Sequence, residues 1–188
     1  MPRTRSALTA GDWAVLALIA EGPTHAFAVA REMAPEGEVG RLWSMRRPLV
    51  YRSVDRLQTD GLVRPSATVP STTGPQRTLL EVTPAGAGAL EAWLQEPVEH
   101  VRDARSLLKL KLLFLSRRGA PCTPLLTAQR ARFAAIAERL EAAVAEADGF
   151  DATLLRWRLE AASAAVRFAD AVLAARPDGQ PPGRPRDP

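Results

Sequence analysis

The sequence is poor in the residues that build disulfides and metal sites. Its 188 residues include one cysteine, Cys122, and two histidines, His25 and His100. A single cysteine excludes an internal disulfide and suits a reducing compartment, and this set is too small for a zinc site of cysteine and histidine ligands. Glycine-rich phosphate loops and the GxSxG nucleophile motif are also missing. We therefore expect neither an enzyme nor a bound metal or cofactor.

Long apolar runs and lysines are scarce as well. No uncharged run approaches the ~20 residues of a membrane-spanning helix, and the start MPRTRSALTAGDW lacks the apolar core of a signal peptide. These absences predict a soluble, cytoplasmic protein. Only Lys109 and Lys111 among the 25 basic residues are lysines, and the net charge is +4. Such mild basicity permits a polyanionic partner without requiring one.

The first part of the chain predicts two helices. Thr9 is a candidate N-cap with Asp12 at the N3 position, and the helix that follows should end at Gly22-Pro23. A second, short helix is expected from His25 to Met33, with His25 capping or packing against it rather than acting in catalysis. The expected core contacts of this helix are Phe27, Val29, Ala30 and Met33.

The stretch from Arg46 to Arg64 predicts a helix with two different faces. Val50, Val54 and Leu57 share an apolar side, and Gly61 fits a C-cap. The opposite side carries Leu49, Arg52, Arg56 and Thr59. Two arginines one turn apart could grip phosphates or present forked donors to guanine edges. A solvated helix face without a ligand is the alternative interpretation.

Strand-like segments follow this helix. Residues 62–69 and 77–82 flank the turn sequence PSTTGP, which predicts a β-hairpin, and Thr83-Pro84 is a strong helix start. Three helices and a hairpin in this order are typical of a winged helix-turn-helix, whose third helix enters the major groove. The excess of charge in this region is basic: Arg46, Arg47, Arg52, Arg56, Arg64 and Arg77 outnumber Asp55 and Asp60.

The remaining chain predicts helices that assemble. A helix is expected over residues 84–95, an almost fully buried one from Ser106 to Ser116, and another from Thr123. The last, Asp151 to Ala175, has two opposed apolar seams. One seam consists of Leu155, Leu159, Ala162, Val166, Ala169 and Leu173, and the other of Trp157, Ala161, Ala164, Phe168 and Ala171. Such a helix needs a cover on both sides, either from a two-fold partner or, as the alternative, from an intrachain bundle alone.

The predicted fold class is therefore mainly α with a small β-hairpin wing, an N-terminal winged helix-turn-helix followed by a C-terminal α-helical dimerisation domain. The expected boundaries are a disordered tail at 1–8, the winged helix at 9–95, the helical domain at 96–176 and a disordered, proline-rich tail at 177–188. Cys122 precedes a predicted helix start, so it is either a redox-sensitive thiol or an incidental exposed cysteine.

Three segments resemble the PadR family of bacterial transcriptional regulators. They read LTAGDWAVLALIAEGPTHAFAVAREM, WSMRRPLVYRSVDRLQTDGLV and GPQRTLLEVTPAGAGALEAWL. The family has a GPxHGY-like helix, an LYxxLxRLExxGL recognition helix and a GRxRKYYxLTxxG wing. The matching residues are Gly22-Pro23, His25, Val50-Tyr51, Val54, Arg56-Leu57, Gly61-Leu62, Gly74, Arg77, Val82-Thr83 and Gly86. The chain departs from the pattern at Ala26, at Pro48-Leu49 in place of Gly-Thr, and at Leu79-Leu80 in place of tyrosines.

The resemblance implies a sequence-specific, DNA-binding transcriptional regulator, a ligand-responsive repressor acting as a homodimer on an inverted-repeat operator. The alternative is a winged-helix module that binds other proteins without specific DNA binding. The predicted DNA-binding residues are Arg46, Arg47, Tyr51, Arg52, Ser53, Arg56, Gln76 and Arg77, although Tyr51 could equally be a core residue. The predicted dimerisation residues are Leu155, Trp157, Leu159, Ala161, Ala164 and Phe168. A candidate pocket for a small apolar or aromatic effector is assigned to Trp13, Trp93 and Leu108, although residues of this kind are more often simple core.

Overall fold

The computed structural model describes residues 8–69 and 77–175. The predicted turn at 70–75, Gln76, the predicted tail at 177–188 and all but the last residue of the predicted tail at 1–8 lie outside this range. The chain divides into two compact units, Met1–Leu94 and Gln95–Pro188.

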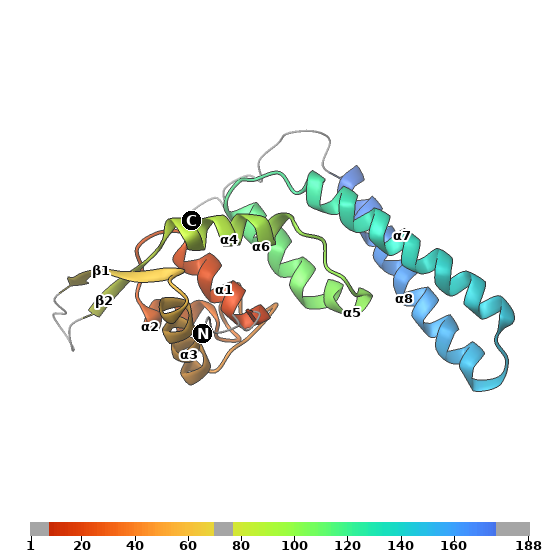
Figure 1. The fold of residues 1–188 in the computed structure, drawn as a ribbon, viewed down its shortest axis with the longest axis horizontal. Coiled ribbons are helices and arrows are strands. Elements are labelled where there is room, and N and C mark those ends of the chain that lie inside the picture. Colours follow the sequence, from red (N-terminus) through yellow and green to blue (C-terminus); the bar gives the residue numbers. More distant parts are fainter. Residues whose placement is uncertain (1–7, 70–76, 176–188) are drawn as a thin grey trace, which may run out of the picture. The chain divides into compact units, whose positions relative to one another are not determined.

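The first unit has the element order of a winged helix-turn-helix, as predicted (Figure 1). Its elements are α1 (Ala10–Ile19), α2 (Ala26–Glu32), α3 (Arg47–Thr59), β1 (Val63–Val69), β2 (Arg77–Val82) and α4 (Pro84–Gln95). Helix α3 packs against α1 and α2, and its apolar side, Val50, Val54 and Leu57, is buried. The apolar floor predicted for the third helix is confirmed.

Side chains cap the first two helices at the positions that the sequence predicted. The Thr9 hydroxyl accepts a hydrogen bond from the backbone N–H of Asp12 (3.2 Å), and the Asp12 carboxylate accepts one from the backbone N–H of Thr9 (2.8 Å). His25 Nδ1 accepts a hydrogen bond from the N–H of Ala28 (3.0 Å) at the start of α2. The spacing of residues in α2 predicted that Phe27 belongs to the core. This prediction is wrong, because 42% of Phe27 is exposed.

The end of α3 is joined firmly to the hairpin. Gly61 has φ +70°, which only glycine adopts without strain, and its N–H donates to the carbonyl of Gln58 (3.0 Å). The N–H of Leu62 donates to the carbonyl of Leu57 (2.9 Å), which completes a Schellman motif. The Thr83 hydroxyl donates to the carbonyl of Gly61 (2.7 Å) at the start of α4. These bonds fix the recognition helix relative to the strands that follow it.

The hairpin pairs β1 with β2 in antiparallel register from Val63 opposite Val82 to Val69 opposite Arg77, with an irregularity between Pro65 and Ala67. Thr24, just before α2, forms an additional bridge with Leu80. The hairpin is therefore connected directly to the end of α3 by the polypeptide chain. The bridge between Thr24 and Leu80 also binds it to the segment that leads into α2.

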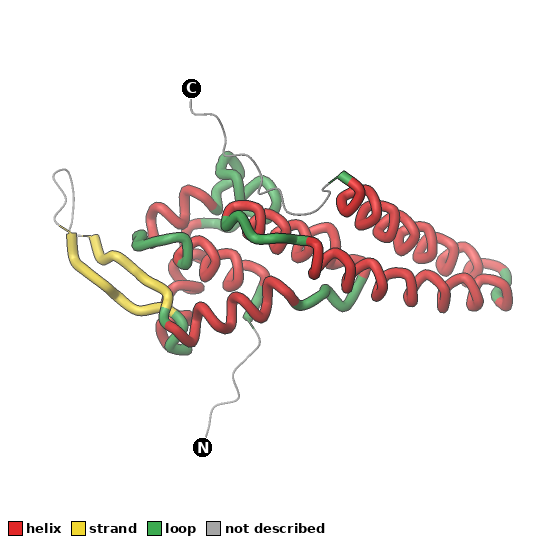
Figure 2. The backbone as a smooth tube through the Cα atoms, turned by 90° about the horizontal axis from the view of Figure 1, so that it is seen from above, coloured by secondary structure: helices red, strands yellow, loops and turns green. Residues whose placement is uncertain are grey.

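The second unit consists of helices (Figure 2). They are α5 (Val101–Asp103), the π-helical turn η1 (Ala104–Leu108), α6 (Lys109–Arg117), α7 (Thr123–Glu146) and α8 (Gly149–Ala174). No residue from Ser106 to Ser116 is exposed, so the predicted burial of this segment is confirmed, although the helical run begins earlier, at Val101. Among the described residues, no helix is long and apolar enough to cross a membrane.

Helices α7 and α8 form an antiparallel pair that buries one seam of α8. Ala162 and Ala169 are fully buried, and the neighbouring seam residues Leu155, Leu159 and Val166 are half-buried. The second predicted seam faces outwards, because Trp157 is 74% exposed. Phe150, Leu154 and Phe168 are also exposed. Within the described chain, α8 is therefore covered on one side only.

A buried lysine and a buried glutamine hold the segment that precedes α5. Lys111 donates a hydrogen bond to the backbone carbonyl of Glu96. Gln129 accepts from the N–H of Val98 (2.6 Å) and donates to its carbonyl (3.0 Å). Cys122, the residue before α7, is buried. The interpretation of Cys122 as an incidental exposed cysteine is therefore wrong.

Lys111 makes the unfolding free energy depend on pH. Burial lowers its pKa from 10.5 to about 8, and the Glu96 carboxylate partly opposes this shift. Between pH 8 and 10.5 the unfolded chain binds more protons than the folded one, so stability rises with pH over this window. The gap corresponds to at most about 3 kcal/mol. We expect Lys111→Met to remove this rise in urea unfolding at pH 7.5 and 9.5.

Lys109→Met is the matched control, because Lys109 lies two residues away on α6 and is less buried. It should keep the wild-type dependence on pH. Equal pH dependence for the wild type and Lys111→Met would refute the assignment of the effect to Lys111.

Candidate nucleic-acid interface

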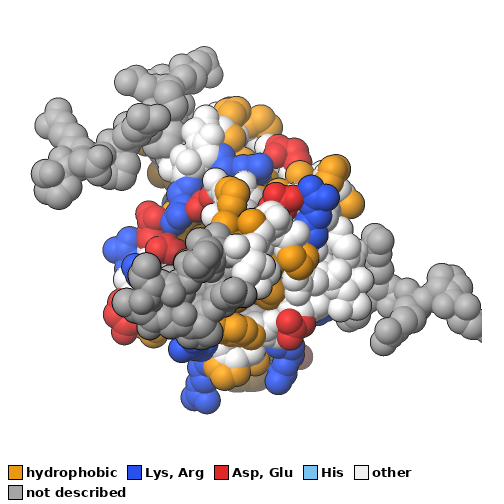
Figure 3. Space-filling view, turned by 90° about the vertical axis from the view of Figure 1, so that its left-hand side faces the viewer, with side chains coloured by type: hydrophobic (Ala, Val, Ile, Leu, Met, Phe, Trp, Pro, Cys, Tyr) orange, Lys and Arg blue, Asp and Glu red, His pale blue; other side chains and the backbone are white. Residues whose placement is uncertain are grey.

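The outer side of α3 carries exposed arginines at its start. Arg46 is the N-cap residue, Arg47 is the first residue of the helix, and Arg52 lies in its second turn. All three are exposed. No acidic residue lies in the first turn of this helix, whose N-terminus itself favours anions. Figure 3 shows the end of the molecule that carries the hairpin, where basic side chains lie among apolar and acidic ones.

Two aromatic rings hold the guanidinium of Arg47. Its carbon atom Cζ lies 4.8 Å from the ring centre of Phe27 and 5.7 Å from that of Tyr51. Nη2 also donates to the Tyr51 hydroxyl over 3.4 Å. Cation–π contacts of this kind restrict the guanidinium without neutralising it. The exposure of Tyr51 rules out the alternative in which it belongs to the core.

Arg56 is engaged within the protein. Its Nη1 donates to Asp12 Oδ2 over 2.9 Å, and its Nε lies 3.9 Å from the carboxylate of Asp60. The Asp12 side chain is almost completely buried, whereas that of Arg56 is 28% exposed. The same Asp12 oxygen also accepts a hydrogen bond from the N–H of Thr9. One carboxylate therefore takes part in the capping box of α1 and binds Arg56 of α3. Arg56 therefore joins the recognition helix to α1.

We expect Asp12→Ala to destabilise the protein by about 2 kcal/mol, more than the ~1 kcal/mol of a lost cap and less than the loss of one partner from a fully buried pair. The change removes both the capping box and the ion pair. Urea unfolding at neutral pH measures it. Asp55→Ala, which removes an equally charged but exposed side chain of α3, should change stability by less than about 0.5 kcal/mol. Equal effects of the two changes would show that the Asp12 bonds contribute little.

The other predicted DNA-binding residues are placed differently from one another. Ser53 is only 5% exposed, which leaves it little surface for a nucleic acid. Arg77 begins β2, opposite Val69, and Gln76 lies outside the described residues. Among the described residues, no group of three or more His, Cys, Asp or Glu side chains is placed to hold a metal ion.

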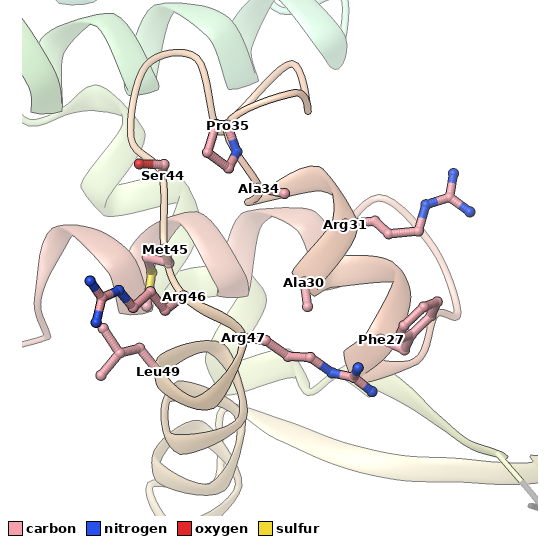
Figure 4. A pocket seen from close by; sticks show the side chains of 10 residues that line it. All are labelled: Phe27, Ala30, Arg31, Ala34, Pro35, Ser44, Met45, Arg46, Arg47 and Leu49. Atoms are coloured by element: carbon pink, nitrogen blue, oxygen red, sulfur yellow. The ribbon is translucent and has the colours of Figure 1, made fainter.

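An open hollow of about 790 Å³ lies beside α2 and the start of α3 (Figure 4). Figure 4 shows Arg47 reaching across it towards Phe27, while Arg46 and Leu49 lie on the other side of the first turn of α3. Its full lining is Phe27, Ala30, Arg31, Ala34, Pro35, Ser44, Met45, Arg46, Arg47 and Leu49. The charged members of this lining are all arginines.

Exposed large apolar side chains gather in two places among the described residues. One group lies between α2 and the first turns of α3: Phe27, Trp43, Leu49 and Tyr51. The other lies on α8: Phe150, Leu154, Trp157 and Phe168. Apolar groups that are concentrated in this way mark interaction surfaces more often than scattered ones do.

The residues of the candidate effector pocket are packed or buried. The rings of Trp13 and Trp93 stack at 5.1 Å between centres and 8° between planes, which joins α1 to α4. Leu108 belongs to the second unit and is fully buried. The assignment of an effector to these three residues stays a prediction.

Comparison with known families decides the identity of this fold. Residues 15–92 match the family described as "Transcriptional regulator PadR-like family". This segment of the chain is PadR-like. The members of that family are transcriptional regulators and not enzymes. The match spans α2, α3 and both strands.

Solved structures resemble the chain over most of its length. The crystal structure of Bacillus subtilis PadR in complex with operator DNA is 20% identical and covers 92% of this chain and 100% of its own, with a TM-score of 0.47. Bacillus subtilis PadR in complex with p-coumaric acid is 18% identical, with coverages of 92% and 98% and a TM-score of 0.40. A PadR-like transcriptional regulator from Bacillus cereus is 14% identical, with the same coverages and a TM-score of 0.41. No curated protein matches the chain.

Sequence reasoning missed the roles of two residues that contact arginines of α3. Phe27 had been assigned to the core, and Asp12 had been recognised only as a capping residue. The aromatic type of Phe27, two positions after His25, gave no signal that it would lie beside Arg47. The charge of Arg56, 44 positions from Asp12, gave no indication of its partner either.

Proposed function

We propose that this PadR-like regulator is a sequence-specific repressor that binds an inverted-repeat operator as a homodimer and is released by a small apolar or aromatic effector. The observation that carries the DNA-binding part is the start of α3, where Arg46, Arg47 and Arg52 are exposed together. Arginine forks suit both phosphates and guanine edges in the major groove. We assign Arg52 to a base and Arg46 and Arg47 to the backbone.

The aromatic face of α8 supports the homodimer. Trp157 and Phe168 lie on a helix whose opposite side is covered by α7, and small residues, Ala161 and Ala164, lie between them. In a two-fold dimer, this face packs against the same face of the second protomer. A dimer then presents two copies of α3 to half-sites about one helical turn apart, or a multiple of it. This spacing is the reason for proposing an inverted repeat.

The effector part of the proposal rests on resemblance to regulators released by small aromatic ligands. Its test is release of bound DNA by members of an aromatic acid and drug-like library. The Trp13–Trp93 stack offers a second readout, because a ligand that separates the two rings would change tryptophan fluorescence.

Selection from randomised duplexes tests the DNA-binding part. The full-length protein should enrich an imperfect inverted repeat within a few rounds. Enrichment of a single, asymmetric half-site would oppose the dimeric mode of binding. Sequences no different from the starting pool would overturn the proposal and favour a winged helix that binds other proteins.

A further inference from the structure

The apolar side chains near the start of α3 do not all have the same role. Phe27 and Tyr51 flank Arg47, and Trp43 lines a second, smaller hollow beside the start of α1. Leu49 remains. It is 42% exposed and borders both hollows, so it forms an apolar ridge between them. A leucine that is exposed in the first turn of this helix is accessible to an apolar group on a bound nucleic acid.

Arg52 is the exposed residue that accompanies Leu49 on this side of α3. The two lie three positions apart, and residues at this spacing share a helix face. The rise between them is roughly 4.5 Å, comparable with the ~3.4 Å between successive base pairs. A helix that lies along the groove and brings Arg52 to one base pair therefore brings Leu49 to a neighbouring one. Arg56, one turn further on, is held by Asp12 and does not compete for this place.

The major groove displays a single kind of apolar group. It is the C5-methyl group of thymine, which 5-methylcytosine also carries, whereas guanine displays two acceptors that fit an arginine fork. We infer that Leu49 is a specificity-determining residue that contacts the C5-methyl group of a pyrimidine next to the guanine read by Arg52. This inference rests on the proposed DNA-binding function. The affinity for each half-site should then depend on the presence of this methyl group.

Removal of one methyl group from the DNA tests the inference. In the selected operator, each thymine of one half-site is replaced in turn by deoxyuridine, and each cytosine by 5-methylcytosine, and affinity is measured by fluorescence anisotropy. One methyl group contributes about 0.8 kcal/mol when buried, so the wild type should lose about fourfold at one thymine. If the contacted pyrimidine is cytosine, it should gain about fourfold on methylation instead.

Variants of the protein assign the effect to Leu49. Leu49→Ala should bind the methylated and unmethylated duplexes equally, while Leu49→Met should keep the methyl dependence because it retains a long apolar side chain. Thr59→Ala, at the far end of the same helix face, should behave as the wild type. Circular dichroism and urea unfolding verify that each variant is folded.

The outcomes separate this inference from the proposed function. Tight, selective binding with no methyl effect at any pyrimidine, or an effect unchanged in Leu49→Ala, would overturn the role of Leu49 and leave DNA binding intact. Failure to select any operator would overturn both. A methyl effect that disappears only in Leu49→Ala would establish the contact, and the position would identify thymine or methylated cytosine as its source.

Discussion

Arg52→Ala is expected to weaken binding to the selected operator by about 5- to 150-fold, which corresponds to ~1 to 3 kcal/mol for the loss of a two-pronged arginine–guanine contact. Arg52 is exposed on the outer side of α3, and its guanidinium makes no hydrogen bond or ion pair with another described residue. Its guanidinium is therefore available to a base. Binding to a scrambled duplex should change far less, so that the ratio between the two affinities falls. Fluorescence anisotropy with both duplexes measures this ratio.

Arg46→Ala is the matched control for Arg52→Ala, since Arg46 is an exposed arginine at the start of the same helix. We assign it to a phosphate, so its loss should weaken specific and scrambled binding alike. It should also reduce the slope of log affinity against log salt by about 0.9. The account would be contradicted by a uniform loss for Arg52→Ala, which would make it a phosphate contact, or by no loss, which would remove Arg52 from the interface.

Trp157→Glu is expected to raise the dissociation constant of the dimer by about 1,000-fold or more. Tryptophan at the centre of an interface often contributes at least ~2 kcal/mol, and the two-fold axis doubles the change. The side chain is 74% exposed in the single chain, so the substitution should not unfold it. Analytical ultracentrifugation of wild type and variant over a range of concentrations gives the dissociation constants. Operator affinity should fall with the dimer.

Arg156→Glu provides the control for Trp157→Glu. It introduces a carboxylate one position away on α8, at an exposed site that lies on the flank of the aromatic face, because neighbouring helical positions point about 100° apart. It should leave the dimer largely intact. A wild-type protein that sediments as a monomer at operator-binding concentrations would reject the homodimer.

Local patterns were enough to predict most of the fold. Thr9 and Asp12 predicted the start of α1, Gly61 the end of α3, and Thr83-Pro84 the start of α4. Each of these signals acts within about four positions, because the side chain bonds to the backbone of its own turn. The alternating faces of the last helix likewise separated the seam that packs in the chain from the exposed Trp157 seam.

Contacts between distant residues could not be predicted in the same way. Periodicity placed Arg56 on the outer side of α3, but only the fold brings it to Asp12. Phe27 has the spacing of a core residue on a helix of seven residues, where small rotations decide between burial and exposure. Ser53 is polar and adjacent to Arg52, yet it lies against the interior. The sequence predicted the recognition helix, and the structure distinguishes which of its side chains remain available.

We propose that the exposed face of α3 reads DNA as part of a dimer. The most direct test of this proposal is the binding of the full-length protein to the selected operator and to a scrambled duplex at two or more salt concentrations, with the stoichiometry determined in the same titration. The account predicts two protomers per operator, selective affinity and a negative log–log salt slope of about 0.9 for each phosphate neutralised. Equal affinity for both duplexes, or binding that is insensitive to salt, would contradict it.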